Sequence, residues 1–216
     1  MAMNRGTRIF AIGDIHGCFE ALCAMLDRIP IAWGKDRLVF MGDYIDRGPQ
    51  SFEVVEHLID LGRRHPGVVF LKGNHEQMLL DYLGGRDRLS YLYNGGRQTL
   101  ESYLRRAGPG IGPPIPAEHL RFFDSLRLYY ETEDYLFVHA GLRHGLPPER
   151  QKAEDLLWIR EGFLAERRSF GKRVIFGHTP FEEPLVEENK IGIDTGAVYG
   201  NKLTCLQLPE EIFHHV

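Results

Sequence analysis

The segment RLVFMGDYIDRG, residues 37–48, joins a short apolar run to a glycine-flanked turn that carries two aspartates and an arginine. The apolar run has the length and composition of a buried strand. The same unit recurs as TRIFAIGDIHG (residues 7–17), VVFLKGNHE (68–76), YLFVHAG (135–141) and RVIFGHTP (173–180). Each expected strand is therefore followed at once by a turn that presents Asp, Asn or His.

Segments with helical periodicity alternate with these strands. Apolar residues recur three and four positions apart in residues 18–29 and 51–65, and Ser51, behind Pro49, is expected to cap the second helix. Residues 108–116 are too rich in Pro and Gly for a regular element. Further helices are expected at residues 76–83, 97–107 and 117–125, and a closing pair of strands at residues 191–193 and 202–208. The alternation of strands and helices predicts the α/β class.

Composition narrows the functional classes. The chain has 216 residues, which suits a single α/β domain, and a formal net charge of -4, which offers no basic surface for nucleic acid. Its apolar runs fall short of the roughly 20 residues that a membrane-spanning helix needs. The three cysteines lack CxxC spacing, which indicates a reducing compartment. We therefore expect a cytoplasmic protein with neither a nucleic-acid nor a membrane partner.

The polar turns share a coherent metal chemistry. Ligands bind outside the carboxyl ends of the strands in open α/β sheets, so side chains from these turns are expected to converge. Carboxylate, imidazole and amide groups suit Mn, Fe, Zn, Co or Ni. They match neither the thiolates of structural zinc sites nor the all-oxygen sites of Ca and Mg. Any one turn alone has an ordinary structural explanation, but all of them in order indicate a site for divalent transition metals.

The motifs GDIHG, GDYIDRG and GNHE, with the later VHAG, FGHTP and IDTGAVYG, resemble the calcineurin-like metallophosphoesterases, and specifically their phosphoprotein phosphatase branch. The resemblance runs from Gly13 to Gly200, and the short length is similar to that of compact bacterial and bacteriophage serine/threonine protein phosphatases. It implies a four-layer α/β/β/α sandwich with two mixed β-sheets and a metal site at the carboxyl ends of the strands. One catalytic domain would span residues 1–216, with a variable helical insert around residues 84–131.

The resemblance also implies a binuclear metal centre. The cofactors would be two divalent ions, Mn²⁺ in the first place, with Fe, Zn, Co or Ni as alternatives. The implied ligands are Asp14 and His16 for the first ion, Asp43 as the bridge, and Asn74, His139 and His178 for the second. His139 is followed by Ala140 instead of a second glycine, and the nearby His144 is an alternative ligand.

Catalytic and phosphate-binding roles follow from the same resemblance. His75 would be the general acid and Asp46 the carboxylate that orients it. Arg47 and Arg160, with Asn74, would bind the substrate phosphate. The alternatives are a third imidazole ligand or a plain turn residue for His75, a helix cap for Asp46, and a surface salt bridge for Arg160.

Two further features have no assigned role. Asn94-Gly95-Gly96 resembles a segment of compact bacterial members and of related dinucleotide hydrolases, but a plain turn explains it equally well. Tyr44 lies near the expected site in the sequence, which fixes neither the direction nor the partner of its hydroxyl group.

The implied activity is single-step hydrolysis of phosphoserine and phosphothreonine by a metal-bridging water, with phosphoproteins or phosphopeptides as substrates. The alternative is a symmetrical bis(5'-nucleosyl)-tetraphosphatase of the same superfamily, acting on dinucleoside polyphosphates. The features that separate these two activities are expected within residues 84–131. A non-enzymatic metal-binding module would lack a ligand or His75, and the sequence lacks neither.

Overall fold

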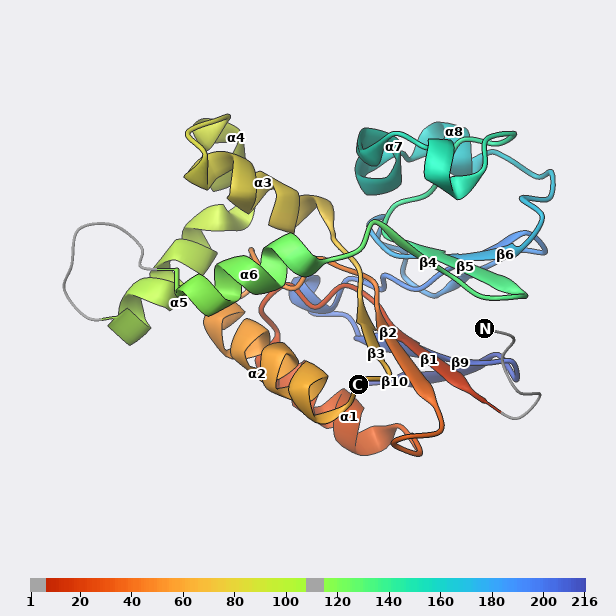
Figure 1. The fold of residues 1–216 in the computed structure, drawn as a ribbon, viewed down its shortest axis with the longest axis horizontal. Helices are drawn as coiled ribbons and strands as arrows, with labels where there is room; N and C mark the ends of the chain where they lie inside the picture. Colours follow the sequence, from red (N-terminus) through yellow and green to blue (C-terminus); the bar gives the residue numbers. More distant parts are fainter. Residues whose placement is uncertain (1–6, 108–114) are drawn as a thin grey trace.

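The computed structural model describes residues 7–107 and 115–216, which form two β-sheets packed face to face with helices on the outer faces (Figure 1). The first sheet has the strand order β10-β9-β1-β2-β3 and the second β4-β5-β6-β8-β7. The strands of the first sheet are β1 (Ile9–Ile12), β2 (Arg37–Phe40), β3 (Val68–Phe70), β9 (Thr204–Leu208) and β10 (Ile212–His215). Those of the second are β4 (Tyr129–Glu131), β5 (Tyr135–Val138), β6 (Arg173–Phe176), β7 (Leu185–Val186) and β8 (Lys190–Gly192).

Both sheets are mixed. Strands β1, β2 and β3 are parallel, as are β5, β6 and β8, and the remaining strands pair antiparallel at their sides. In β1, Ile9 and Ala11 face the core between the sheets, while Phe10 and Ile12 face the helices. Apolar residues on both faces explain why this strand reads as a continuous apolar run. The expected α/β sandwich with two mixed sheets is confirmed.

Helices cover the outer face of each sheet (Figure 1). On the first sheet these are α1 (Phe19–Arg28), α2 (Ser51–Arg64), α3 (Asn74–Leu83) and α6 (Ala117–Ser125). On the second sheet they are α7 (Ala153–Trp158) and α8 (Glu161–Leu164). The remaining helical segments are α4 (Arg88–Tyr91), η1 (Leu92–Gly96), α5 (Arg97–Ala107), η2 (Pro148–Arg150) and η3 (Ala197–Tyr199). Helix α5 packs beside α2 and continues from η1, so residues far apart in sequence meet near the start of α2.

The expected start of α2 is confirmed, but its expected cap and the expected start of α3 are wrong. Gln50, and not Ser51, is the N-cap of α2; Ser51 is its first residue, and its hydroxyl accepts the N–H of Asp46 at 3.2 Å. Helix α3 begins at Asn74, earlier than residue 76, because the Glu76 carboxylate turns back to accept the Gly73 N–H at 2.8 Å. Asn74 therefore occupies the first turn of a helix.

The expected closing pair of strands is also wrong. Strand β8 belongs to the second sheet and β9 to the first, so the two do not pair with each other. Instead β9 pairs antiparallel with β1 and with β10, a strand for which no expectation was formed. Of the irregular segment expected at 108–116, residues 108–114 lie outside the described residues.

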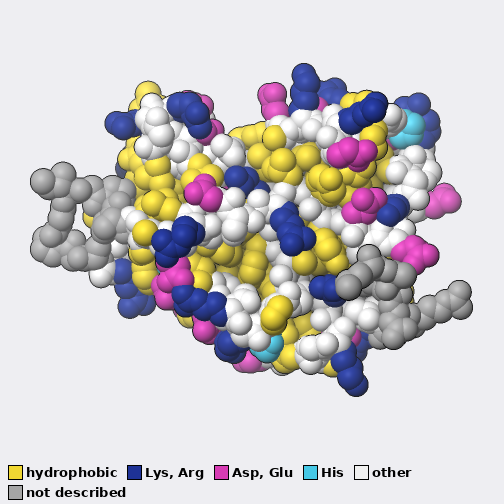
Figure 2. All heavy atoms as spheres, in the orientation of Figure 1, with side chains coloured by type: hydrophobic (Ala, Val, Ile, Leu, Met, Phe, Trp, Pro, Cys, Tyr) yellow, Lys and Arg dark blue, Asp and Glu magenta, His cyan; other side chains and the backbone are white. Residues whose placement is uncertain are grey.

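The surface shows no concentration of one charge sign on the face drawn in Figure 2, where basic and acidic side chains are interspersed. This agrees with the small net charge of -4. None of the helices in the described ranges is long and apolar enough to cross a membrane.

Candidate metal centre

The polar turns converge although their strands belong to different sheets. The first three follow β1, β2 and β3, and the other two follow β5 and β6. The sheets meet at this edge, where the His178 N–H donates to Asp14 Oδ2 at 3.0 Å and His139 Nδ1 donates to the Met41 carbonyl at 2.8 Å. All six expected ligands are buried: Asp14, His16, Asp43, Asn74, His139 and His178.

Asp43 lies between two groups of potential ligands. Its Oδ2 is 3.4 Å from His16 Nε2, and its Oδ1 is 3.4 Å from His139 Nε2. One group with ligand atoms close enough to hold an ion combines Asp43 with His16 and His75, and the other combines it with His139 and His178. A carboxylate whose two oxygens face different clusters is suited to bridge two cations.

Asn74 completes the second group. Its Oδ1 is 2.9 Å from His139 Nε2 and 2.9 Å from His178 Nδ1. The start of α3 places this amide oxygen, and the Gly73 before it leaves no room for a side chain: a Cβ there would lie 2.0 Å from Asp43 Oδ1. Glycine at position 73 is therefore required by the close approach of the Asp43 carboxylate.

Backbone carbonyls fix the tautomers of two histidines. His16 Nδ1 donates to the Ile45 carbonyl at 2.8 Å, and His139 Nδ1 donates to the Met41 carbonyl. Each ring therefore carries its proton on Nδ1 and offers Nε2 as a ligand atom. Burial lowers the pKa of His16 to about 3, so its imidazole is neutral, which is the form that binds metals.

A cation fits the electrostatics of this cluster. Among the described residues, the buried Asp14 Oδ1 has no hydrogen-bond partner. Burial, followed by the neighbouring Asp194 and Asp43 carboxylates, raises the pKa of Asp14 well above its usual value. Buried carboxylates that repel one another beside neutral imidazoles are stabilised by a divalent ion. This cluster fits the binuclear divalent metal centre that the sequence resemblance implies.

Metal binding should therefore stabilise the fold. We expect Mn²⁺ at about 100 times its dissociation constant to add about 2.7 kcal/mol to the free energy of unfolding of chelator-treated protein. For a chain of this size, that corresponds to a rise of roughly 5–10 °C in Tm. Scanning calorimetry with and without Mn²⁺ measures the shift, with Ca²⁺ as the control ion. An unchanged Tm would contradict a metal site at this cluster.

The two residues expected to form an acid pair, His75 and Asp46, are hydrogen-bonded to each other. His75 Nδ1 donates to Asp46 Oδ2 at 2.7 Å, and both side chains are buried. Burial alone would lower the pKa of His75, but the Asp43 charge and the Asp46 hydrogen bond outweigh it, so the pKa is raised. The Asp46 carboxylate contacts His75 and not the start of α2, which removes the helix-cap alternative. His75 Nε2 lies 3.9 Å from Asp43 Oδ2, so the position of the ring leaves a metal-ligand role open.

The two expected phosphate-binding arginines contact histidines of the cluster. Arg47 Nη1 lies against His16 Nε2, and Arg160 Nε donates to His178 Nε2 at 3.0 Å. The Arg160 guanidinium forms no salt bridge with a carboxylate in the described part of the chain, because its hydrogen bonds go to His178. The structure therefore does not support the surface salt bridge. A metal on His178 Nδ1 would move the ring proton to Nε2, and the Arg160 guanidinium would then have to turn away from this nitrogen.

The Asn94-Gly95-Gly96 segment supports Arg47 and is more than a plain turn. The Gly95 carbonyl accepts the Arg47 N–H at 3.0 Å. Gly95 has φ = 100°, and a Cβ on it would lie 2.7 Å from both the backbone nitrogen and Cγ of Arg47. Because Gly95 has no side chain, the turn that carries Arg47 can pack directly against its backbone.

Substitution of Gly95 tests this support. Gly95→Ala should displace Arg47 and raise KM for a phosphate ester about tenfold, the loss expected for a misplaced bidentate contact. The matched control is Gly171→Ala, because Gly171 has φ = 85° with open space around the missing Cβ and lies in a different turn. The two variants share the cost of a left-handed alanine, so steady-state kinetics isolates the contact with Arg47. Equal KM values would contradict it.

Two other residues lie apart from the cluster. The hydroxyl of Tyr44 is buried and donates to the Leu71 carbonyl at 2.6 Å, which makes Tyr44 a core residue. His144 Nε2 lies 3.1 Å from the Ser169 carbonyl and its ring packs against Phe170. His144 therefore lies outside the two ligand groups, whereas His139 belongs to one of them.

Backbone conformation marks the same region. Seven non-glycine residues in the described ranges have positive φ, and five of them are in the site: His16, Asp43, Asp46, Arg47 and His178. Such left-handed conformations cost energy and concentrate at functional sites. The backbone of these turns is therefore strained, and this conformation directs the five side chains into the site.

Two further residues contribute to the site without having been expected from the sequence, Asp194 and Glu76. Asp194, in the IDTG turn after β8, is buried, and burial is the main cause that raises its pKa to about 6. Its position after an apolar run matches the pattern of the other turns, so the sequence did contain a signal. Glu76 accepts the backbone N–H groups of Asp43 and Tyr44 at 3.0 and 2.8 Å and holds the Asp43 turn in place.

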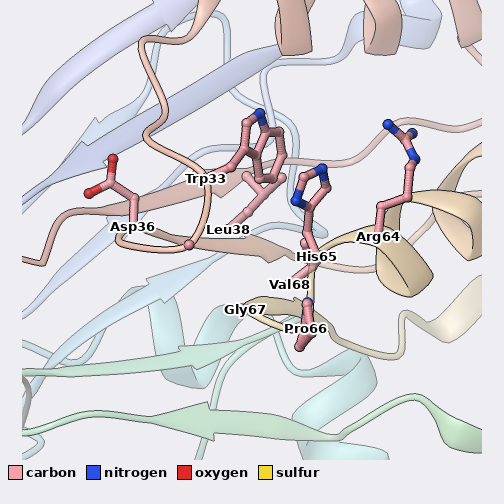
Figure 3. A pocket seen from close by; sticks show the side chains of 9 residues that line it. Trp33, Asp36, Leu38, Arg64, His65, Pro66, Gly67 and Val68 are labelled. Atoms are coloured by element: carbon pink, nitrogen blue, oxygen red, sulfur yellow. The ribbon is translucent and has the colours of Figure 1, made fainter.

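A separate pocket lies where β2 and β3 begin, at the ends of these strands that are remote from the ligand turns (Figure 3). The rings of Trp33 and His65 stack there with centroids 3.9 Å apart. Asp36 lines the same pocket but is already paired with Arg8 at 2.6 Å. This pocket contains none of the expected site residues.

The sandwich and the paired ligand groups at its edge define a metal-dependent phosphoesterase. The family profile described as calcineurin-like phosphoesterase matches residues 7–204, and the chain belongs to this family. It is a hydrolase of the metallophosphoesterase class, as the resemblance implied.

Curated relatives carry two kinds of name. Bis(5'-nucleosyl)-tetraphosphatase PrpE [asymmetrical] of Geobacillus sp. (strain WCH70) is 29% identical over 227 residues, covering 94% of this chain and 91% of the relative. Serine/threonine-protein phosphatase 1 of Salmonella typhimurium is 31% identical over 204 residues, covering 93% of this chain and 91% of the relative. The substrate is therefore not fixed by these similarities.

A solved structure shares the fold. A candidate diadenosine tetraphosphatase superposes with a TM-score of 0.78 at 24% identity, covering 99% of this chain and 94% of that one. At this level of identity, the similarity shows a shared fold and does not identify the substrate.

Proposed function

We propose that this protein is a metal-dependent phosphatase for phosphate monoesters of alcohols, with phosphoserine and phosphothreonine of proteins or peptides as its substrates. The observation that carries the proposal is the buried His75–Asp46 pair, with its 2.7 Å hydrogen bond, beside the candidate metal ligands. The metals would be two divalent ions, with Mn²⁺ as the first choice for their native identity.

The leaving group explains why this pair matters. Hydrolysis of phosphoserine expels an alkoxide, a poor leaving group that needs a proton as the bond to phosphorus breaks. Hydrolysis of a dinucleoside polyphosphate expels a phosphate anion, which is stable without that proton. The Asp46 carboxylate, which accepts the hydrogen bond from His75 Nδ1, favours the protonated imidazole that can act as the acid. The pair is therefore better matched to alcohol monoesters.

The remaining residues bind and orient the phosphoryl group. When bound, the divalent ions would supply positive charge to the phosphoryl oxygens and lower the pKa of the attacking water. Arg47 and Arg160 approach the cluster from opposite ligand groups, beside His16 and His178 respectively. Guanidinium groups placed on two sides can neutralise the charge that develops on the equatorial oxygens.

A second candidate is hydrolysis of dinucleoside tetraphosphates. Exposed aromatic rings lie beside the site: Tyr199 is 65% exposed under Arg47, and Trp158 is 42% exposed next to His178. Such rings can stack with nucleobases. The tetraphosphatase relative is named as an asymmetrical enzyme, which favours asymmetrical over symmetrical cleavage for this candidate reaction.

A paired assay separates the candidates. Chelator-treated protein reloaded with Mn²⁺ is given a phosphothreonine peptide or diadenosine tetraphosphate, and kcat/KM is measured for each. We expect the peptide to be turned over faster. Faster turnover of the dinucleotide would replace the proposal by the second candidate, and the nucleotide products would show whether cleavage is asymmetrical. The Asp43→Asn variant, which lacks the carboxylate shared by both ligand groups and is purified in the same way, controls for contaminating phosphatases.

A further inference from the structure

We infer that Tyr91 and Thr99 are positioning residues, which hold Asp46 so that His75 presents its free nitrogen to the leaving group. Both lie in residues 88–107, within the segment expected to be variable. The inference rests on the proposed function, because it takes His75 to be the general acid.

The contacts form a closed set around Asp46. Tyr91 Oη donates to Asp46 Oδ1 at 2.9 Å, and Thr99 Oγ1 donates to the same oxygen at 2.7 Å. The other oxygen, Oδ2, accepts the hydrogen bond from His75. Thr99 Oγ1 also accepts the Asp46 N–H at 2.8 Å, which fixes the backbone and the side chain of the aspartate together.

Burial makes these hydroxyl groups significant. Asp46 is 0% exposed, Tyr91 is 1% exposed and Thr99 is 0% exposed, so water does not replace a lost donor freely. A buried carboxylate that loses a donor is poorly satisfied and gains freedom to rotate. Asp46 also has φ = 72°, a conformation that surrounding contacts must maintain. Rotation of its carboxylate would turn the His75 ring away from the reacting phosphate.

A packing role for Tyr91 can be separated from a positioning role. Its ring packs against Tyr82 with centroids 5.1 Å apart, and Gly96 leaves room for it, since a Cβ there would lie 2.4 Å from the ring. Tyr91→Phe keeps this ring and removes only the hydroxyl group. The chain also offers a matched control in Tyr103→Phe: Tyr103 is a buried tyrosine of α5, and its hydroxyl bonds to His119 Nδ1 at 2.7 Å, away from Asp46.

The test compares leaving groups. The Mn²⁺-loaded protein hydrolyses 4-nitrophenyl phosphate, whose phenolate leaves without help, and phenyl phosphate, whose leaving group needs a proton. For Tyr91→Phe we expect kcat on phenyl phosphate to fall about tenfold, as for other residues that orient a functional side chain. On 4-nitrophenyl phosphate we expect a change of less than about twofold. Tyr103→Phe should leave both rates unchanged.

Thr99 provides an independent pair of variants. Thr99→Ser keeps the hydroxyl group and should retain the wild-type ratio of the two rates. Thr99→Val keeps the shape of the side chain but should lower the rate on phenyl phosphate more than the rate on 4-nitrophenyl phosphate. Equal losses on both substrates, or no loss on phenyl phosphate in Tyr91→Phe and Thr99→Val, would overturn the inference. Thermal melts identify a variant that merely unfolds, and Tyr91→Phe, which keeps the packed ring and removes only the donor to Asp46, decides in that case.

Failure of the proposed function has a different signature. If the wild type cleaves both aryl phosphates but not the phosphothreonine peptide, the proposed substrate fails and the leaving-group comparison still stands. If His75→Asn shows no change in leaving-group dependence, then His75 is not the acid, and both proposals fall together.

Discussion

Asp43→Asn is expected to lower kcat/KM by about a thousandfold or more, because the removal of a bridging charge forfeits several kcal/mol of metal-dependent stabilisation. Asp43 is the residue that both ligand groups share, with one oxygen facing His16 and the other facing His139. An amide cannot present two anionic oxygens, so at most one ion should remain tightly bound. Metal content after gel filtration and kcat/KM with 4-nitrophenyl phosphate measure the two effects.

Strand β2 provides the control for this substitution. Asp36 precedes the strand at the end opposite Asp43, is also buried, and pairs with Arg8 at 2.6 Å while accepting the Ala32 N–H at 2.8 Å. Asp36→Asn should cost stability but preserve metal content and kcat/KM. An Asp43→Asn protein that keeps both ions and wild-type turnover would show that Asp43 does not bridge.

His75→Asn is expected to lower kcat on a phosphothreonine peptide by about 10²–10⁴-fold, the range for loss of a general acid. Metal content should stay unchanged, because in the proposed role His75 is bonded to Asp46 through Nδ1 and gives its other nitrogen to the leaving group. The loss should be much smaller on 4-nitrophenyl phosphate, whose leaving group needs no proton. Metal analysis alongside kinetics on both substrates provides the test.

Another buried histidine serves as the control for His75. His119 bonds to Tyr103 and to Glu56 at 2.7 and 2.9 Å, away from the ligand groups, so His119→Asn should change stability and not kcat. Loss of an ion from His75→Asn would support the alternative in which His75 is a third imidazole ligand. Near-wild-type turnover would remove it from both roles.

The two candidate activities depend on side chains outside the shared motifs. Tyr199 and Trp158 are exposed beside the site, and Tyr91 and Thr99 come from the segment between α3 and α6. That residues 84–131 distinguish the two activities remains a proposal. The hydrogen bonds from Tyr91 and Thr99 to Asp46 suggest how this segment would do so. A segment that tunes the acid pair would favour alcohol esters over polyphosphates.

The sequence by itself determined the local elements and the donor chemistry. Apolar runs fixed the strands, and the helices at residues 97–107 and 117–125 have the expected bounds, because periodicity and propensity act over a few residues. The Asp, Asn and His side chains of the turns could be read as a metal-binding set from residue type alone. Helix starts were less accurate, since Glu76 settles the start of α3 by turning back to Gly73.

Only the tertiary structure decided which atoms meet. Tyr91 and Thr99 lie 45 and 53 residues from Asp46 in sequence. Thr99 reaches it because α5 packs beside α2, and Tyr91 reaches it from α4, which packs beside α3. The partners that fix the His16 and His139 tautomers are backbone carbonyls, which every residue type possesses, so no side-chain pattern could reveal them. Long-range contacts depend on how whole elements pack, whereas strand and turn identity depends on near neighbours in the chain.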